Sequence, residues 1–245
     1  MSAPRRQSLI LAARYRDCLL GDTGGLFLLL AQAPLIGWLC AVVWGSIERD
    51  TPALYFVLCL AAVWFGCINA CREIVKERAI LERERLLGIR PRDYVASKVW
   101  VLAALGAAQV ILLQGTVEWH LQLRGPMLLE LLALFGASVA GTGLGLLVSA
   151  LARTQERAVF AVPLLLLPQI LFSELAIPNN LYSDVVAAGE KAMPVHWAFR
   201  VFEESAALEP RWHMVVLFLI VLFAMAAALV VVATVALLPQ REVVT

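Results

Sequence analysis

Six long stretches without a charged residue constrain this 245-residue chain more than any other feature; they span residues 23–47, 51–71, 99–117, 131–152, 158–173 and 214–240. A helix needs about 20 apolar residues to cross a bilayer. Five stretches reach this length directly, and 158–173 reaches it if the helix extends past Glu174 to Ile177. The sequence therefore predicts an all-α integral membrane protein with six transmembrane helices.

The overall composition excludes two other classes of protein. Only 16% of residues are charged and 61% are hydrophobic, whereas soluble domains are about 25% charged. The net charge of +1 gives no basic field of the kind that attracts nucleic acid. We therefore expect the lipid bilayer, and no nucleic acid, to be the partner that the bulk of the chain contacts.

The distribution of lysine and arginine predicts the orientation of the helices. With a cytosolic N-terminus, the inside segments carry 15 of these cations and the outside segments carry 5. This bias places both termini in the cytosol. The sequence predicts a cytosolic tail with an interfacial amphipathic helix at residues 1–22, a six-span domain at 23–240 and a second cytosolic tail at 241–245. Within the six-span domain we expect a cytosolic loop at 72–98 and an outer segment with a re-entrant helix at 174–211.

The cytosolic loop 72–98 is rich in charged helix-forming residues, and Gly88 and Pro91 punctuate it. We expect a helix that ends near Gly88 and a further helix that begins near Pro91. A hairpin this charged could simply be solvated. The loop also carries five apolar residues that such a hairpin would leave unburied, and this favours a docking surface; they are Ile80, Leu81, Leu86, Leu87 and Ile89.

Small residues recur every four positions in the fourth predicted span, at Ala137, Gly141 and Gly145. This spacing indicates close helix packing rather than a phosphate loop, because the stretch is apolar and lacks the lysine of a P-loop. The fifth span contains Pro163 and Pro168, which predict a bend. In the outer segment, a short apolar stripe that includes Val195 and Phe202 predicts a re-entrant or interfacial helix.

An intramembrane enzyme is one alternative, with Ser138 as nucleophile and His213 as base. Ser138 lies deep in its helix and His213 at the outer mouth of another, so the two depths disagree. The chain also lacks the P-loop pattern, so we expect no enzyme activity and no cofactor in this chain. An ATP-independent channel or secondary carrier is the second alternative, although a mid-membrane ionisable residue, its usual marker, is missing.

Four stretches together resemble the membrane domain of G-subfamily (white-type) ABC transporters, especially their bacterial relatives. They are CREIVKERAILERERLLGIRPRDYVASK, SALARTQERA, PLLLLPQILFSELAIP and MPVHWAFRVF, at residues 71–98, 149–158, 163–178 and 193–202. The resemblance implies a permease subunit of an ABC exporter in the bacterial inner (plasma) membrane. It further implies two partners, a second permease copy and a separate ATP-binding subunit that binds ATP and magnesium.

The resemblance also assigns roles to individual residues. It implies that the loop carries a coupling helix that docks on the ATPase, with the coupling residues Arg83, Glu84, Arg85, Leu87, Gly88 and Arg90. Glu84 would pair with a cation of the ATPase or fix the turn through Arg83 and Arg85. The implied substrate path, between the second and fifth spans, contains Phe65, Asn69, Phe160 and Gln169. The implied outer gate contains Glu174 and Leu175 beside Ala176, with Glu174 at a position where the family usually has a small residue.

Overall fold

The structure is a computed structural model of the chain. It describes the backbone of residues 3–45, 51–86, 88–121, 123–175 and 183–238, and side chains in these ranges except those of residues 3–6, 85 and 86. All regular secondary structure in these ranges is helical. The prediction of an all-α protein is therefore confirmed for the described part of the chain.

Five segments are long and apolar enough to cross a membrane: α2 (Thr23–Trp44), the segment Pro52–Glu84, α5 (Pro91–His120), α6 (Met127–Leu151) and α10 (Trp212–Ala236). The second of them consists of α3 (Pro52–Ala70), the short 3-10 helix η1 (Val75–Glu77) and most of α4 (Arg78–Leu86). The predicted fifth span forms α7 (Gln155–Leu171), which has only 17 residues and contains both prolines. The sixth span and the orientation therefore stay predictions.

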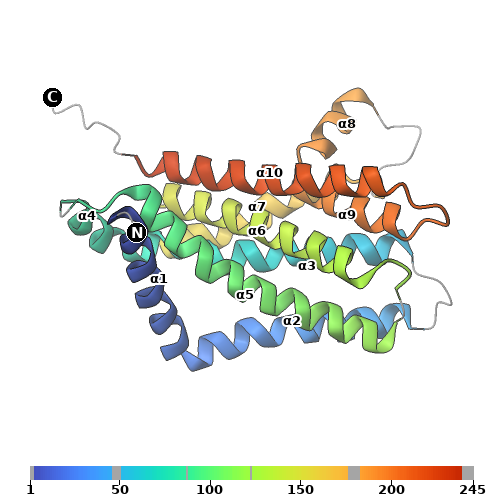
Figure 1. The fold of residues 1–245 in the computed structure, drawn as a ribbon, viewed down its shortest axis with the longest axis horizontal. Helices are drawn as coiled ribbons and strands as arrows, with labels where there is room; N and C mark the ends of the chain where they lie inside the picture. The colour runs from blue at the N-terminus through green and yellow to red at the C-terminus, as the bar shows by residue number, and fades with distance from the viewer. Residues whose placement is uncertain (1–2, 46–50, 87, 122, 176–182, 239–245) are drawn as a thin grey trace.

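Three shorter helices complete the fold: α1 (Ala3–Gly21), α8 (Asp184–Lys191) and α9 (Pro194–Ser205). Figure 1 shows α1, α4 and the last turn of α10 at one end of the bundle, which we call the α4 end. Helices α8 and α9 lie toward the opposite end, which we call the α9 end. The described parts of the segments that the sequence assigns to the cytosol thus lie at one end, and the described part of the outer segment lies toward the other.

Local sequence signals explain where the helices begin and end. Asp22 accepts a hydrogen bond from the backbone of Gly25 and begins α2, and Thr51 does the same for Leu54 at the start of α3. Gly88 has φ +89°, a left-handed conformation that favours glycine, between α4 and α5. Pro91 then occupies the first turn of α5, where its missing N–H costs nothing. The turn predicted at Gly88 is therefore present.

Two clusters of buried apolar side chains hold the bundle together. The larger one joins α3, α5, α6 and α9 to parts of α2, α7 and α10, and it includes Phe65, Leu134 and Phe202. The smaller one lies at the α4 end and includes Tyr15 of α1, Leu81 of α4 and Tyr94 of α5. The predicted apolar stripe of the outer segment forms the buried face of α9, where Val195, Val201 and Phe202 are all buried.

Candidate functional site

Helix α4, within the predicted coupling loop, has two distinct faces at the α4 end of the bundle. Leu81 is buried in the chain's own core, so part of the apolar set expected to contact a partner is already covered. Ile80, Glu82 and Arg83 are exposed on the other face. An apolar side chain with charged neighbours is the composition of a protein–protein contact with a polar rim. The face available to a partner is therefore the one that carries Ile80 and Arg83.

The structure gives Glu84 a partner that the sequence analysis missed. Its carboxylate forms an ion pair with Arg14 of α1, 70 residues earlier in the chain. The Glu84 side chain is largely buried in this pair, whereas that of Arg14 is half exposed. This contact links α4 directly to α1.

The remaining predicted coupling residues lie around the turn after α4. Arg83 and Arg90 are exposed, and Arg90 precedes the first residue of α5. Gly88 forms the left-handed turn. Leu87 lies outside the described residues, and Arg85 is placed in α4 by its backbone alone.

A group of charged side chains connects the start of this loop to α1 and α5. The Lys98 ammonium lies 2.8 Å from a Glu77 oxygen and 3.3 Å from a Glu73 oxygen, and its side chain is only 2% exposed. It also lies 3.7 Å from the centre of the Tyr15 ring, a cation–π contact with α1. Removing one member of a buried ion pair leaves an uncompensated charge. The group therefore fixes α1 and the η1 segment to α5.

Helices α3 and α6 meet at backbone contact, as the small-residue ladder predicts. A Cβ atom on Gly66 would lie 2.0 Å from the carbonyl oxygen of Ser138, and one on Gly141 would lie 2.2 Å from that of Val63. One on Gly145 would lie 2.6 Å from the carbonyl oxygen of Cys67. The interpretation of these glycines as helix-packing residues is confirmed.

The four predicted substrate-path residues do not gather at one place within a single chain. Phe65 is fully buried in the core, whereas Phe160 is 76% exposed on α7. The Asn69 amide donates to Gln109 Oε1 at 2.6 Å, and the Gln109 amide donates to the Leu29 carbonyl at 2.8 Å. Asn69 therefore ties α3 to α5 and, through Gln109, to α2, which is the role of a polar residue between packed helices.

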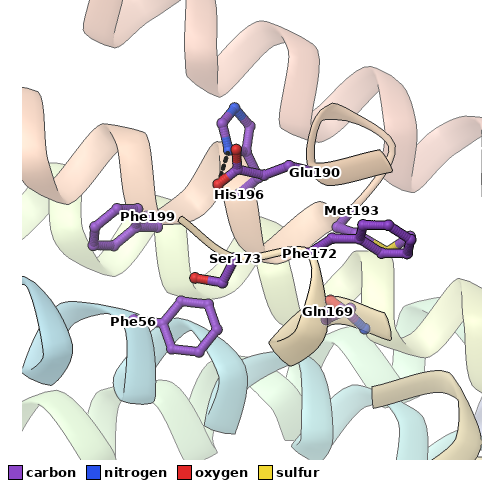
Figure 2. Close-up of a pocket in the computed structure, with 8 residues that line it drawn as sticks. All are labelled: Phe56, Gln169, Phe172, Ser173, Glu190, Met193, His196 and Phe199. Atoms are coloured by element: carbon purple, nitrogen blue, oxygen red, sulfur yellow. Dashed lines mark ion pairs between the residues drawn. The ribbon is translucent and has the colours of Figure 1, made fainter. Parts of the chain in front are cut away.

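Gln169, the fourth predicted path residue, lines a small pocket that Figure 2 shows where α7 ends. The pocket also contains Phe56 of α3, Glu190 of α8 and His196 of α9. His196 Nδ1 lies 3.2 Å from a Glu190 carboxylate oxygen, and both side chains are buried. Burial lowers the pKa of His196, although Glu190 opposes this shift. Burial thus favours the neutral form of the imidazole, which contacts the buried side chain of Glu190.

The carboxylate of the predicted outer gate forms an ion pair with an arginine. Glu174 pairs with Arg200 of α9 at 3.0 Å, and Arg200 pairs in addition with Glu203 at 2.6 Å. Leu175 is exposed, and Ala176 lies outside the described residues. The carboxylate at this unusual position is therefore anchored to α9 rather than solvated alone.

The structure gives no support to the catalytic alternative. Ser138 is buried where α6 meets Gly106 of α5, eleven residues after the start of α6. His213 is exposed in the first turn of α10. At 1.5 Å per residue, Ser138 lies about 16 Å along its helix. Among the described residues, no group of three or more His, Cys, Asp or Glu side chains could hold a metal ion.

Comparison with known proteins agrees with this arrangement. The family model described as ABC-2 type transporter matches residues 6–207. An ABC transporter ATP-binding/permease protein of Mycobacterium tuberculosis is 28% identical over 193 residues, which is 71% of this chain and 22% of that protein. The chain thus spans less than a quarter of the length of that relative. Because the family match covers most of a helical chain with several apolar spans, the resemblance found in the sequence is confirmed, and this transmembrane transport permease belongs to the ABC-2 type transporter family.

Proposed function

We propose that the chain is the permease subunit of an ABC exporter that works with a separate ATPase. ATP and magnesium are bound by the ATPase, and two permease copies enclose the substrate path in the bacterial inner membrane. The exposed face of α4 at the α4 end carries this proposal, because it combines Ile80 with Glu82 and Arg83 on a helix that is anchored to the membrane bundle.

The proposed mechanism is alternating access. ATP binding closes the ATPase dimer, and the docked α4 helix moves with it. Helix α4 is tied to α1 through Glu84 and Arg14, and it leads through Gly88 into the 30-residue helix α5. A displacement at α4 therefore acts on elements that reach the α9 end. The substrate class is a lipid, a hydrophobic natural product or another amphiphile, since the exposed surface of α7 is apolar at Phe160 and Leu164.

The docking face is tested by reversing the charge of Arg83, for which no ion pair is found among the described residues. Arg83→Glu is expected to fold normally and to reduce the amount of copurified ATPase, because like charges at a protein contact cost several kcal/mol. The measurement is the ratio of ATPase to permease after purification in mild detergent, together with ATP hydrolysis of the purified complex. Lys191→Glu, an exposed change at the α9 end, is the control and should leave the ratio unchanged. An unchanged ratio in Arg83→Glu would remove this face from the contact.

The orientation is tested by cysteine labelling in intact cells. Cys18 is exposed and the other four cysteines are buried, so Cys18→Ser gives a background without exposed thiols. Leu208→Cys, at a side chain that is 95% exposed near the α9 end, should react with an impermeant maleimide. Arg90→Cys should react only after the cells are opened. The reverse pattern would place α4 outside the cell and end the ATPase proposal.

A secondary carrier makes a different prediction for the same preparation. Such a protein needs no ATPase, so the purified permease would carry out transport without ATP hydrolysis. Glu73 and Lys98 are buried and Glu77 is half-buried, but these ionisable residues lie at the α4 end and form ion pairs with one another and with Lys76. This pairing favours a structural role for them over an ion-coupling role.

A further inference from the structure

The hydroxyl of Ser149, near the end of α6, holds the chain where it breaks between α3 and η1. Ser149 Oγ accepts hydrogen bonds from the backbone N–H groups of Ile74 and Val75, at 2.9 and 3.0 Å. Ser149 and Ile74 are both fully buried. A second tie lies beside it, because the Arg78 guanidinium donates to the Ala150 carbonyl oxygen at 2.6 Å. Two side chains thus join the start of the α4 loop to the last turn of α6.

This junction continues the close contact between α3 and α6. Gly141, Gly145 and Ser149 are spaced four residues apart, so they share one face of α6. The two glycines contact the α3 backbone and Ser149 contacts the backbone that follows it. The stripe therefore runs from the packed middle of the bundle to the base of the coupling loop.

Helix α7 begins only a few residues after this junction. Residues 152–154 connect α6 to α7, and the Thr154 hydroxyl accepts from the backbone of Arg157 to begin the helix. Helix α7 also packs against η1. Beside it lies an open groove of about 640 Å³, which is lined by Arg72 and by residues at the start of α7, Thr154, Gln155, Glu156, Val159 and Phe160. The loop is therefore connected to this groove through Ser149, the last turn of α6 and residues 152–154.

We propose that Ser149 and Arg78 are positioning residues that transmit movement of the docking helix α4 to α7 and to the groove beside it. This inference rests on the proposed function, because it takes α4 as the element that an ATPase moves. It adds a specific route and two residues that the coupling assignment at Arg83–Arg90 does not contain. Ser149 lies in α6, outside the exposed face of α4, and the Arg78 guanidinium donates to α6 at the Ala150 carbonyl oxygen. Loss of the Ser149 hydroxyl should therefore separate docking from transmission.

The physical basis is the loss of an acceptor in a buried place. Ser149→Ala removes the hydroxyl that accepts hydrogen bonds from the N–H groups of buried Ile74 and half-buried Val75. Leaving these groups without an acceptor costs free energy, and a local shift of the loop away from α6 lowers that cost. The loop then moves without carrying the last turn of α6 and α7 with it. The surface of α4 that carries Arg83 keeps its own anchors at Leu81 and Glu84.

The experiment measures how accessible the groove beside α7 is to a thiol reagent in the assembled complex. Gln155→Cys places a thiol at the exposed first residue of α7, in the Cys18→Ser background and with the ATPase bound. The rate of labelling by a fluorescent maleimide is measured with and without ATP and vanadate, which together trap the closed ATPase dimer. With Ser149 present, the labelling rate should change when ATP and vanadate are added. Ser149→Ala should reduce this change by at least about fivefold, which is equivalent to about 1 kcal/mol of lost coupling. Ser205→Ala, an equally buried serine of α9, should retain the full change.

The outcomes separate this inference from the proposed function. Failure of any ATPase to bind would overturn the proposed function itself. A bound ATPase with the same nucleotide-dependent change in Ser149→Ala as in the parent would overturn only the transmission route. Loss of ATPase binding in Ser149→Ala would also overturn it, because the residue would then shape the docking surface. If Ser149→Ala does not fold, Arg78→Met cuts the second tie alone and should reduce the change in the same direction, and an unreduced change would refute the route.

Discussion

Gly66→Ala is expected to destabilise the folded permease strongly, whereas Gly115→Ala in another membrane helix should not. The new Cβ at position 66 would lie 2.0 Å from Ser138 O and 2.5 Å from Thr142 N. Backbone atoms cannot rotate away as side chains can, so α3 and α6 must separate, at a cost of about 3 kcal/mol or more. Gly115 is exposed, and a Cβ added there would meet no atom within 4 Å.

Both changes replace glycine by a better helix former, so intrinsic propensity favours the variant in each case. The measurement is the apparent melting temperature in detergent, followed by the monodisperse fraction in size-exclusion chromatography. Gly66→Ala should lower both quantities, and Gly115→Ala should leave them equal or higher. Equal melting temperatures for the two variants would show that α3 and α6 do not meet at backbone contact.

Glu84→Arg should uncouple the permease from its ATPase, and Arg14→Glu in the same chain should restore much of the coupling. The single change places two guanidinium groups together where the structure has an ion pair between α4 and α1. The double change rebuilds the pair with its charges exchanged, and contacting residues of this kind show coupling energies of about 0.5–3 kcal/mol. We expect the single variant to fold and insert, since Arg14 is half exposed.

The measured quantity is ATP hydrolysis by the purified complex, with the ATPase-to-permease ratio recorded beside it. The Glu84→Arg complex should lose activity by about tenfold, equivalent to about 1.4 kcal/mol, and the double variant should recover most of it. Absence of any recovery would mean that Glu84 acts directly on the ATPase, as the sequence alone suggests, and that its pair with Arg14 is incidental. Normal activity in the single variant would remove Glu84 from coupling altogether.

Periodic features of the sequence were good predictors of this fold. The four-residue spacing of Ala137, Gly141 and Gly145 indicates a narrow helix face, and the structure packs that face on α3. Gly88 and Pro91 indicate local backbone conformation, and both lie where α4 gives way to α5. Such signals depend on a residue and its near neighbours, so a single sequence contains them in full.

Partnerships between distant residues could not be predicted in the same way. Glu84 pairs with Arg14 across 70 residues and Ser149 contacts Ile74 across 75, and no spacing rule connects such positions. Asn69 is predicted as a polar residue of the substrate path, and its side-chain N–H donates to Gln109 of α5. A polar residue within an apolar span can be recognised in the sequence, whereas the identity of its hydrogen-bond partner depends on how the helices are arranged.

The length of α7 shows a further limit of apolar stretches. The uncharged segment continues to Ser173, yet the helix ends at Leu171, shortly after Pro168. Proline removes a backbone donor and crowds the preceding turn, so a helix with two prolines tends to bend or stop early. Hydropathy alone counts the apolar residues and does not register where the helix ends.

Site-specific photo-crosslinking from position 83 tests the role of α4 as the ATPase-docking helix. A photoreactive amino acid replaces the exposed Arg83 on α4, and a matched variant carries it at the exposed Leu208 near the α9 end. After irradiation of intact membranes, crosslinked products are identified by mass spectrometry and tested for binding of an ATP analogue. We expect an ATP-binding partner crosslinked from position 83 and none from position 208. An ATP-binding partner reached from position 208, or none reached from position 83, would contradict the assignment of α4 as the docking helix of an ABC exporter.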